Sequence, residues 1–411
     1  MNIFYIPSWY PSFSDPLSGY FFRDQALMMT KHFPELKIGI STWGQNDERL
    51  LLWSARPLSS MKKILDAGKI FSTQNNISNN TIEFFTPALT WSWKIKKGNI
   101  DNIIDANLNN YRLFKAKYGK VDVIHAHTAF PGGYIAMKIS EITGVPYIIT
   151  EHMSPFPFKC FIDNKGELAD RIRDPYSKSK MNIAVSFALA DKMTAFGVPN
   201  VRVIHNSVDE QIFQPPKEKP PLYPFTFFTL GRMTAQKGID ILLKAIKLIR
   251  PDKKIRFRIG GDGEDLEKYK KLAFDLGIDQ QVKWLGNLNQ TKVASEMQNC
   301  NAFVLPSRHE SMGIVFAEAI ACGKPVIGTR CGGPEEIIND ANGYLILSEN
   351  SIETHDRASL HLANAIRRMI ENYDMFDPKT IRADFEQRFS SKTITAQIME
   401  IYAEVIGGKD A

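Results

Sequence analysis

Residues 302–336, AFVLPSRHESMGIVFAEAIACGKPVIGTRCGGPEE, constrain the fold of this chain more than any other stretch. An apolar run at 302–305 predicts a strand, and a polar loop separates it from a small-residue helix expected at about 312–322. The Gly-Lys-Pro at 323–325 ends this helix, and a second apolar strand at 325–328 follows. Strand, loop, helix and strand predict a βαβ unit whose loop lies at the carboxyl end of a parallel strand, where α/β sheets bind ligands.

Two carboxylates lie in this loop and helix. Glu310 precedes the helix and Glu318 lies about two turns into it, so both can contact one ligand from different ends. Between them, Ser311, Met312 and Gly313 present backbone N–H groups at a helix N-terminus, which accepts phosphate. These groups suit a nucleotide sugar, whose hydroxyls flank a diphosphate. The alternative is one loop glutamate and one solvated helix glutamate.

The stretch ESMGIVFAEAIACGKPVIGTRCGGPEEII resembles the donor-site block of the retaining GT-B glycosyltransferases of family 4, the "glycosyl transferases group 1". The E-x7-E spacing, the CGKPVI strand and the GGPEE that follows stand where that family has them. The resemblance implies an α/β protein with two Rossmann-like, doubly wound domains that face each other across a cleft. It also implies that Glu318 holds the ribose, that Glu310 contacts the transferred sugar, and that the backbone from Ser311 through Ile314 contacts the diphosphate.

The length of 411 residues is sufficient for two domains with separate cores. No apolar run reaches the roughly 18 residues of a membrane span, and the N-terminal MNIFYIPSWYP lacks the features of a signal peptide. The four cysteines show no metal-like spacing and are expected to be reduced. We therefore expect a cytoplasmic protein.

The net charge of +6 is unevenly placed. Residues 1–206 carry 24 Lys and Arg against 17 Asp and Glu, and the remainder carries 27 against 28. The basic first half suits an anionic partner such as lipid headgroups, a lipid-linked phosphate or an acidic glycan. Nucleic acid is a poorer interpretation, since neither a basic run nor a nucleic-acid motif occurs.

An aromatic and basic cluster offers one place for such a contact. LTWSWKIKKGN combines two tryptophans with three lysines, namely Trp91, Trp93, Lys94, Lys96 and Lys97. Clusters of this kind can dock peripherally at the inner face of a membrane. The alternative is a solvated edge whose aromatic rings pack inward.

A loop containing Gly19 separates an apolar strand, NIFYIP, from a helix, FFRDQALMMTKHF. The family has a glycine-containing loop here that faces the donor phosphate and the acceptor. Many relatives have two glycines, and this chain has Ser18 and Gly19 instead. Gly19 therefore either contacts phosphate or only supplies a turn.

Three histidines follow neighbouring predicted strands. VDVIHAH ends at His125 and His127, and VPYIIT ends at Glu151 and His152. We expect His125 and His127 to point to opposite faces of their strand, which argues against a shared metal ion. The resemblance implies that His127 lies near the transferred sugar and the phosphate, and His152 matches a further cleft position in the family.

A proline-rich segment, PPKEKPPLYP, marks a linker between two domains. We expect an acceptor-side domain over 1–206, a linker over 207–222 and a donor-binding domain over 223–389. The last helix is expected from about 384 to 406, with Ile398, Ile401, Tyr402 and Val405 on one apolar stripe. The resemblance implies that the segment at about 390–411 packs back on the first domain.

The strand FTFFTL opens the donor-binding domain and leads into GRMTAQKG. Gly231 allows a sharp turn, and Arg232 and Lys237 precede an amphipathic helix, where two cations can neutralise a diphosphate leaving group. Two solvated surface charges are the alternative. GR…KG resembles the second donor motif of the family, whereas GGDGED lacks the glycines of a dinucleotide fingerprint, so NAD is not implied.

Residues and resemblance together predict a retaining glycosyltransferase that moves a sugar from a UDP- or GDP-linked donor to a glycan or lipid-linked acceptor, in surface polysaccharide or glycolipid biosynthesis. No metal or other cofactor is expected, because the cations neutralise the diphosphate. The alternatives are a non-catalytic protein that binds a sugar nucleotide or a glycan, and a GT-B sugar-nucleotide epimerase.

Overall fold

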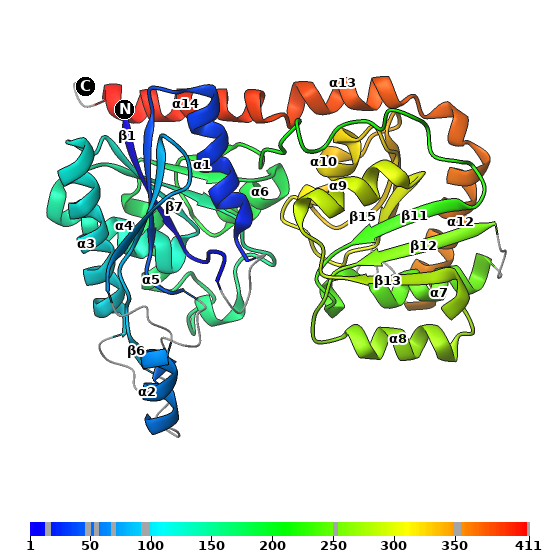
Figure 1. Cartoon of the computed structure of the whole chain (residues 1–411), viewed down its shortest axis with the longest axis horizontal. Coiled ribbons are helices and arrows are strands. Elements are labelled where there is room, and N and C mark those ends of the chain that lie inside the picture. Colours follow the sequence, from blue (N-terminus) through cyan, green and yellow to red (C-terminus); the bar gives the residue numbers. More distant parts are fainter. Residues whose placement is uncertain are drawn as a thin grey trace. The chain divides into compact units, whose positions relative to one another are not determined.

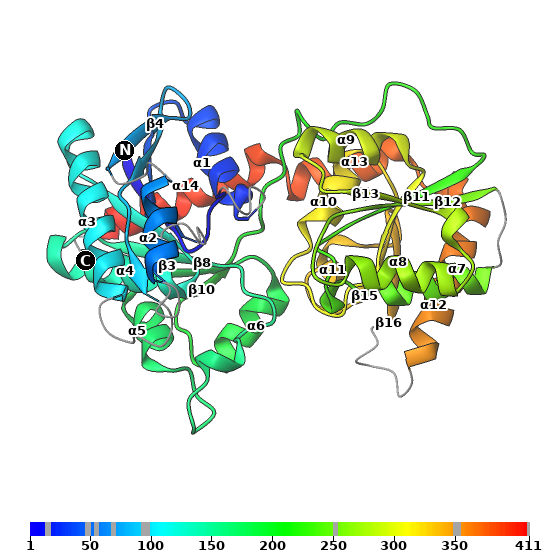
Figure 2. The same cartoon turned by 60° about the horizontal axis from the view of Figure 1, so that its bottom comes forward.

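The computed structural model describes residues 1–12, 18–45, 51–52, 57–66, 71–91, 99–249, 254–347 and 355–408. The chain forms two compact units, each an α/β sheet with its own helices (Figures 1 and 2). Unit 1 comprises residues 1–185, 190–204 and 395–411, and unit 2 comprises residues 186–189 and 205–394.

Unit 1 is built on an eight-stranded sheet in the order β10-β9-β8-β7-β1-β2-β5-β4, parallel except for the β4–β5 pair. Its strands are β1 (Asn2–Pro7), β2 (Lys37–Thr42), β4 (Thr73–Asn76), β5 (Thr81–Phe85), β7 (Val123–His127), β8 (Tyr147–Glu151), β9 (Met181–Ala184) and β10 (Val201–Val203). Its helices are α1 (Tyr20–His32), α3 (Asn99–Tyr118), α4 (Tyr134–Thr143), α5 (Asp170–Lys178), most of α6 (Phe187–Ala195) and most of α14 (Ser391–Gly407). A short ribbon of β3 (Leu51–Leu52) and β6 (Thr90–Trp91) lies beside α2 (Pro57–Asp66).

Unit 2 is built on a six-stranded parallel sheet in the order β13-β12-β11-β14-β15-β16. Its strands are β11 (Phe225–Leu230), β12 (Ile255–Gly260), β13 (Val282–Gly286), β14 (Ala302–Leu305), β15 (Val326–Arg330) and β16 (Gly343–Leu347). Its helices are α7 (Ile239–Ile249), α8 (Leu266–Asp275), α9 (Gln290–Asn299), α10 (Ile314–Ala321), α11 (Pro334–Ile337), α12 (His355–Glu371) and α13 (Pro378–Arg388).

Both sheets have a point where the strand order reverses. In unit 1 the chain runs outward from β1 through β2 and β5, then returns to β7 on the other side of β1. In unit 2 it runs outward from β11 through β12 and β13, then returns to β14 on the other side of β11. The loops after the two central strands diverge at such a point and leave room for a ligand at the carboxyl edge.

The central strands are buried on both faces because helices cover both sides of each sheet. Every residue of β7, β8 and β14 is buried, which explains why β14 is a continuous apolar run rather than an alternating pattern. The predicted strand FTFFTL matches β11, and the predicted strand AFVL matches β14.

The C-terminal part departs from the sequence expectation in two ways. Gly343–Leu347 forms the edge strand β16, which was not predicted from the sequence. The single helix expected at 384–406 is two helices, because Ser390 forms a parallel bridge to Val208 and its hydroxyl accepts a hydrogen bond from the Thr393 N–H. The stripe of Ile398, Ile401, Tyr402 and Val405 is buried on α14 as predicted.

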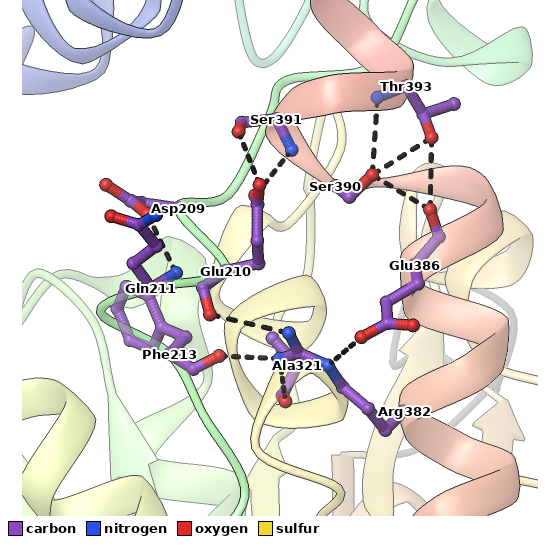
Figure 3. Close-up of polar contacts among 10 residues, drawn as sticks. All are labelled: Asp209, Glu210, Gln211, Phe213, Ala321, Arg382, Glu386, Ser390, Ser391 and Thr393. Atoms are coloured by element: carbon purple, nitrogen blue, oxygen red, sulfur yellow. Dashed lines mark hydrogen bonds and ion pairs between the residues drawn. The ribbon is translucent and has the colours of Figure 1, made fainter. Parts of the chain in front are cut away.

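Residues 207–222, expected to form a linker, belong to unit 2, where Val208 and Phe213 are buried. Polar contacts fasten the start of this segment to α13 and α14 (Figure 3). The Arg382 guanidinium donates to the carbonyls of Phe213 at 2.7 Å and Ala321 at 2.6 Å. The Glu210 carboxylate accepts from the backbone N–H and the hydroxyl of Ser391, each at 2.9 Å.

No helix in the described part of the chain is long and apolar enough to span a bilayer. Of the predicted aromatic and basic cluster, Trp91 ends β6, and Trp93, Lys94, Lys96 and Lys97 lie outside the described residues.

Candidate functional site

In unit 2, the predicted donor residues gather at the carboxyl ends of β11 and β14. Lys237 Nζ donates to Glu310 Oε1 at 2.6 Å, and the Ser307 hydroxyl donates to the same oxygen at 2.8 Å. The Lys237 and Glu310 side chains are 20% and 7% exposed, so water screens this ion pair only partly. Lys237 has two further N–H donors for a phosphate oxygen while Glu310 holds it in place.

Two close approaches hold the β11 and β14 loops together. Gly238 has φ +65°, and a Cβ there would lie 2.0 Å from the carbonyl oxygen of Pro306, so only glycine fits. Gln236 donates through its side chain to the His309 carbonyl at 2.8 Å and accepts from the Arg308 backbone N–H at 2.7 Å. These contacts between the two loops place Lys237 against Glu310.

Arg308 and Asp240 complete the loop contacts and were not singled out from the sequence. The Arg308 guanidinium forms two hydrogen bonds with the Asp240 carboxylate, at 2.8 and 3.0 Å, and a third with the Ala235 carbonyl at 2.6 Å. Burial alone would raise the pKa of Asp240, but the Arg308 guanidinium lowers it below its usual value. The two charges are 68 residues apart in sequence, so no local pattern could have paired them.

The loop after β14 leads into α10, which begins at Ile314, two residues later than predicted. Gly313 precedes it with φ +79°, in the left-handed region that favours glycine. Met312 is buried and its sulfur accepts from the Asn206 N–H, so its side chain supports the loop rather than facing a ligand. Ser311 is half-buried, and Glu318 is buried about one turn into the helix. The helix N-terminus remains suited to an anion.

Arg232 follows β11 directly after Gly231. Its side chain is exposed, and within the described ranges its guanidinium has no hydrogen bond or ion pair. A Cβ at Gly231 would approach Lys237 Cγ to 3.3 Å, so glycine lets the Lys237 stem lie against the turn. Substitution of Arg232 would therefore break no polar side-chain contact with the described part of the chain.

In unit 1, the predicted histidines lie together at the carboxyl ends of β7 and β8. His127 is fully buried, and its Nδ1 lies 3.3 Å from His152 Nε2. The rings of His125 and His127 stack with centroids 4.6 Å apart at 24°. The expectation that they point to opposite faces is wrong, because residues two apart on a strand lie on the same face.

Burial controls the charge of these histidines. It lowers the pKa of His125 and of His152 from 6.5 to about 3, and burial together with its two histidine neighbours places the pKa of His127 well below its usual value. All three are neutral at pH 7. Among the described residues, His127 Nε2 and His152 Nδ1 are buried without a hydrogen-bond partner, as expected of nitrogens that a ligand would satisfy.

Glu151, which sequence reasoning passed over, fixes the backbone around these histidines. Its buried carboxylate accepts from the backbone N–H groups of His152 and Met153 at 2.8 Å and of Ala129 at 3.0 Å, and from the Tyr176 hydroxyl. Burial raises the pKa of Glu151, and the four donors oppose that effect. One side chain thus joins the loops that follow β7 and β8.

Gly19 lies at the N-terminus of α1 with φ +65°, and a Cβ there would lie 2.6 Å from the Trp9 carbonyl oxygen. The positive φ and this close approach both favour glycine at this turn, whether or not Gly19 also contacts phosphate. Within the described ranges, no group of three or more His, Cys, Asp and Glu side chains is arranged to hold a metal ion.

Comparisons with known proteins agree with this arrangement. Residues 210–377 match the family described as "Glycosyl transferases group 1", and residues 95–212 match "Glycosyltransferase Family 4". The two matches together run without a break from 95 to 377. An uncharacterised glycosyltransferase of Methanocaldococcus jannaschii is 29% identical over 72% of this chain and 80% of its own length. A D-inositol 3-phosphate glycosyltransferase of Pseudarthrobacter chlorophenolicus is 27% identical over 64% of this chain and 68% of its own length.

Solved structures share the fold. Sucrose-phosphate synthase from Thermosynechococcus elongatus superposes with a TM-score of 0.73 over 99% of both chains at 16% identity. Anabaena HepE in complex with UDP and glucose gives 0.66 over 98% of this chain and 100% of that chain at 18% identity. The predicted GT-B fold is confirmed: the chain has two α/β domains, each built on a sheet of mainly parallel strands. The chain belongs to the group 1 glycosyltransferases of family 4, enzymes that transfer a sugar from a nucleotide-sugar donor to an acceptor.

Proposed function

We propose that unit 2 holds the donor diphosphate through Arg232, Lys237 and the N–H groups at the start of α10, and that the sugar is transferred with retention at its anomeric carbon. The observation that carries this proposal is the ion pair of Lys237 and Glu310 beside the helix N-terminus. Lys237 offers its remaining donors to the phosphate, and Glu310 accepts from hydroxyls of the sugar. Glu318 binds the ribose hydroxyls.

The chemistry is charge stabilisation at the leaving group. As the bond from the anomeric carbon to the phosphate oxygen breaks, the diphosphate gains negative charge, and Arg232, Lys237 and the α10 amides stabilise it. The acceptor oxygen bonds the same face of the anomeric carbon, and its proton passes to a phosphate oxygen of the leaving group. Neutral His127 orients the sugar by hydrogen bonding. Two cations and a helix terminus perform the neutralisation that a metal ion would, so we propose a reaction without metal.

Nucleotide-dependent thermal stabilisation of the purified protein in EDTA tests the donor site. A ligand at 100 times its dissociation constant stabilises the folded state by about 2.7 kcal/mol. We expect UDP and UDP-sugars to raise the melting temperature more than GDP counterparts, since one structural neighbour was solved with UDP. Arg232→Ala should keep the melting temperature of the free protein and weaken the nucleotide about 10- to 100-fold.

Arg256→Ala, which removes another exposed arginine of unit 2 on β12, is the matched control and should bind nucleotide normally. A wild type that no nucleotide or nucleotide sugar stabilises would contradict the proposed donor site. Equal stabilisation of Arg232→Ala and wild type would remove Arg232 from it.

We further propose that the acceptor is a lipid-linked or membrane-bound glycan and that α2 contacts an anionic membrane surface. Leu58, Met61 and Leu65 are 82%, 53% and 62% exposed and lie on one face of α2. Exposed Lys62 adjoins this face, and exposed Lys63 lies on the opposite side of the helix. Figure 1 shows α2 beyond the strands of the main sheet of unit 1. An apolar stripe with a lysine beside it suits the interface of an anionic bilayer.

Vesicle flotation tests this contact. We expect the protein to float with vesicles rich in phosphatidylglycerol at low salt and to stay behind with pure phosphatidylcholine. Replacing both Leu58 and Leu65 with serine should abolish flotation without changing the melting temperature, because both side chains are exposed. Phe274→Ser on α8, where the side chain is 72% exposed, is the control. Unchanged flotation of the double variant would refute a role for α2.

A further inference from the structure

The C-terminal helix α14 reaches the histidines of β7 through one side chain, Tyr402. Tyr402 Oη lies 2.7 Å from His125 Nδ1 and 3.0 Å from Tyr5 Oη. On its other side, His125 Nε2 lies 2.7 Å from Thr150 Oγ1. Tyr5, His125 and Tyr402 are fully buried and Thr150 is 3% exposed, so water competes for none of these bonds.

The His125 ring stacks against the His127 ring and so restricts its orientation. The two rings stack at 4.6 Å and 24°, and Phe22 stacks against His127 at 4.5 Å and 30°. The His127 ring has one polar contact among the described residues, the 3.3 Å approach of its Nδ1 to His152 Nε2. Its ring is therefore positioned mainly by neighbours, and His125 is the neighbour that hydrogen bonds hold on both ring nitrogens.

A neutral imidazole has one donor and one acceptor nitrogen, so its two hydroxyl partners must take opposite roles. If Tyr402 donates to Nδ1, then Nε2 carries the proton and donates to Thr150, and Tyr5 is left to donate to Tyr402. The alternative tautomer reverses every bond of the chain. Loss of the Tyr402 hydroxyl would remove the hydrogen-bond partner that determines whether Nδ1 of His125 carries the proton.

We propose that Tyr402 is a positioning residue for glycosyl transfer: through His125 it holds the His127 ring in the orientation that contacts the transferred sugar. The proposal rests on the function proposed for His127. Packing alone does not require a tyrosine here, because its stripe neighbours Ile398, Ile401 and Val405 are aliphatic and a phenylalanine would fill the same volume. Among the residues that the structure describes, the hydroxyl adds only its bonds to His125 and Tyr5.

The test is Tyr402→Phe, assayed with the nucleotide sugar that most stabilises the wild type. Transfer to water is followed as release of the nucleoside diphosphate, so no acceptor needs to be known. We expect kcat to fall about tenfold while KM and nucleotide-dependent stabilisation stay unchanged, because the donor residues lie in unit 2. The ¹⁵N resonances of labelled histidine should show an altered tautomer balance at His125.

Tyr5→Phe is the matched control. It removes a buried hydroxyl whose hydrogen bond goes to Tyr402 and leaves the Tyr402–His125 bond in place, so kcat should stay within about twofold of the wild type. Wild-type kcat and histidine spectrum in Tyr402→Phe would overturn the proposal, and so would equal losses in both variants, which indicate packing. A wild type that neither binds nor hydrolyses any nucleotide sugar would instead refute the proposed function.

Discussion

His125, His127 and His152 are neutral because their environment excludes water. Burial lowers the pKa of each, and for His127 the two neighbouring histidines lower it further. A neutral His127 cannot offset negative charge on the leaving diphosphate. In the proposed reaction its contribution is a directed hydrogen bond from or to Nε2, while Arg232 and Lys237 supply the positive charge.

These histidines predict how the stability of the protein depends on pH. In the unfolded chain they bind protons below their usual pKa of 6.5, whereas in the folded chain His125 and His152 stay neutral down to about pH 3. The contribution of these neutral histidines to the free energy of unfolding is complete above pH 6.5 and is lost as the pH falls from 6.5 towards 3. Well below pH 6.5, each of these two histidines lowers the free energy of unfolding by about 1.4 kcal/mol for every unit by which the pH falls.

Urea unfolding of wild type and His125→Gln at pH 7.5, 6.5 and 5.5 measures this effect. The wild type should lose stability over this range, and the variant should lose it with a shallower slope whatever its absolute stability. Parallel slopes would show that His125 does not stay neutral in the folded protein.

At the scale of elements, the break between α13 and α14 depends on long-range contacts. Val208 bridges Ser390, and the Glu210 carboxylate accepts from the first N–H and the hydroxyl of α14 at Ser391 (Figure 3). A carboxylate at a helix N-terminus also interacts favourably with the helix dipole. The segment after residue 205 thus serves as the N-terminal cap of the last helix.

Substitutions at Glu210 should separate the charge from the hydrogen bonds. Glu210→Ala removes both, and we expect a loss of about 1–2 kcal/mol in the free energy of unfolding. Glu210→Gln keeps an acceptor for the Ser391 N–H and should cost less than the alanine variant. Guanidinium titrations of the two variants check this order, and equal losses would show that the hydrogen bonds are not the source of the stabilisation.

At the scale of the whole molecule, neither unit is one continuous piece of chain. The chain passes from unit 1 to unit 2 after Val185 and returns within α6 at Ala190. It changes unit again between Ile204 and His205, and within α14 between Ile394 and Thr395. A chain cut after residue 206 would leave unit 1 without the buried α14 stripe and without Tyr402, which bonds His125. The return of the C-terminus is therefore part of the structure around the histidines and not an appendage.

The sequence by itself determined the local elements and the family. Apolar runs predicted β1, β11 and β14, and the spacing of Glu310 and Glu318 with GR…KG identified the donor motifs. These features are readable because strand length, helix period and loop chemistry depend on residues close together in the chain. The same local reasoning was wrong where it mistook the strand face of His125 and His127 and where it continued one helix through Ser390.

Tertiary structure alone decided which side chains meet. Lys237 contacts Glu310 across 73 residues, Arg308 contacts Asp240 across 68, and Tyr402 contacts His125 across 277. Partner choice depends on which loops the strand order brings to the same sheet edge and on where the last helix returns. The spacing of residues along the chain does not show which distant residues meet. The sequence could therefore identify the functional groups but not the contacts that orient them.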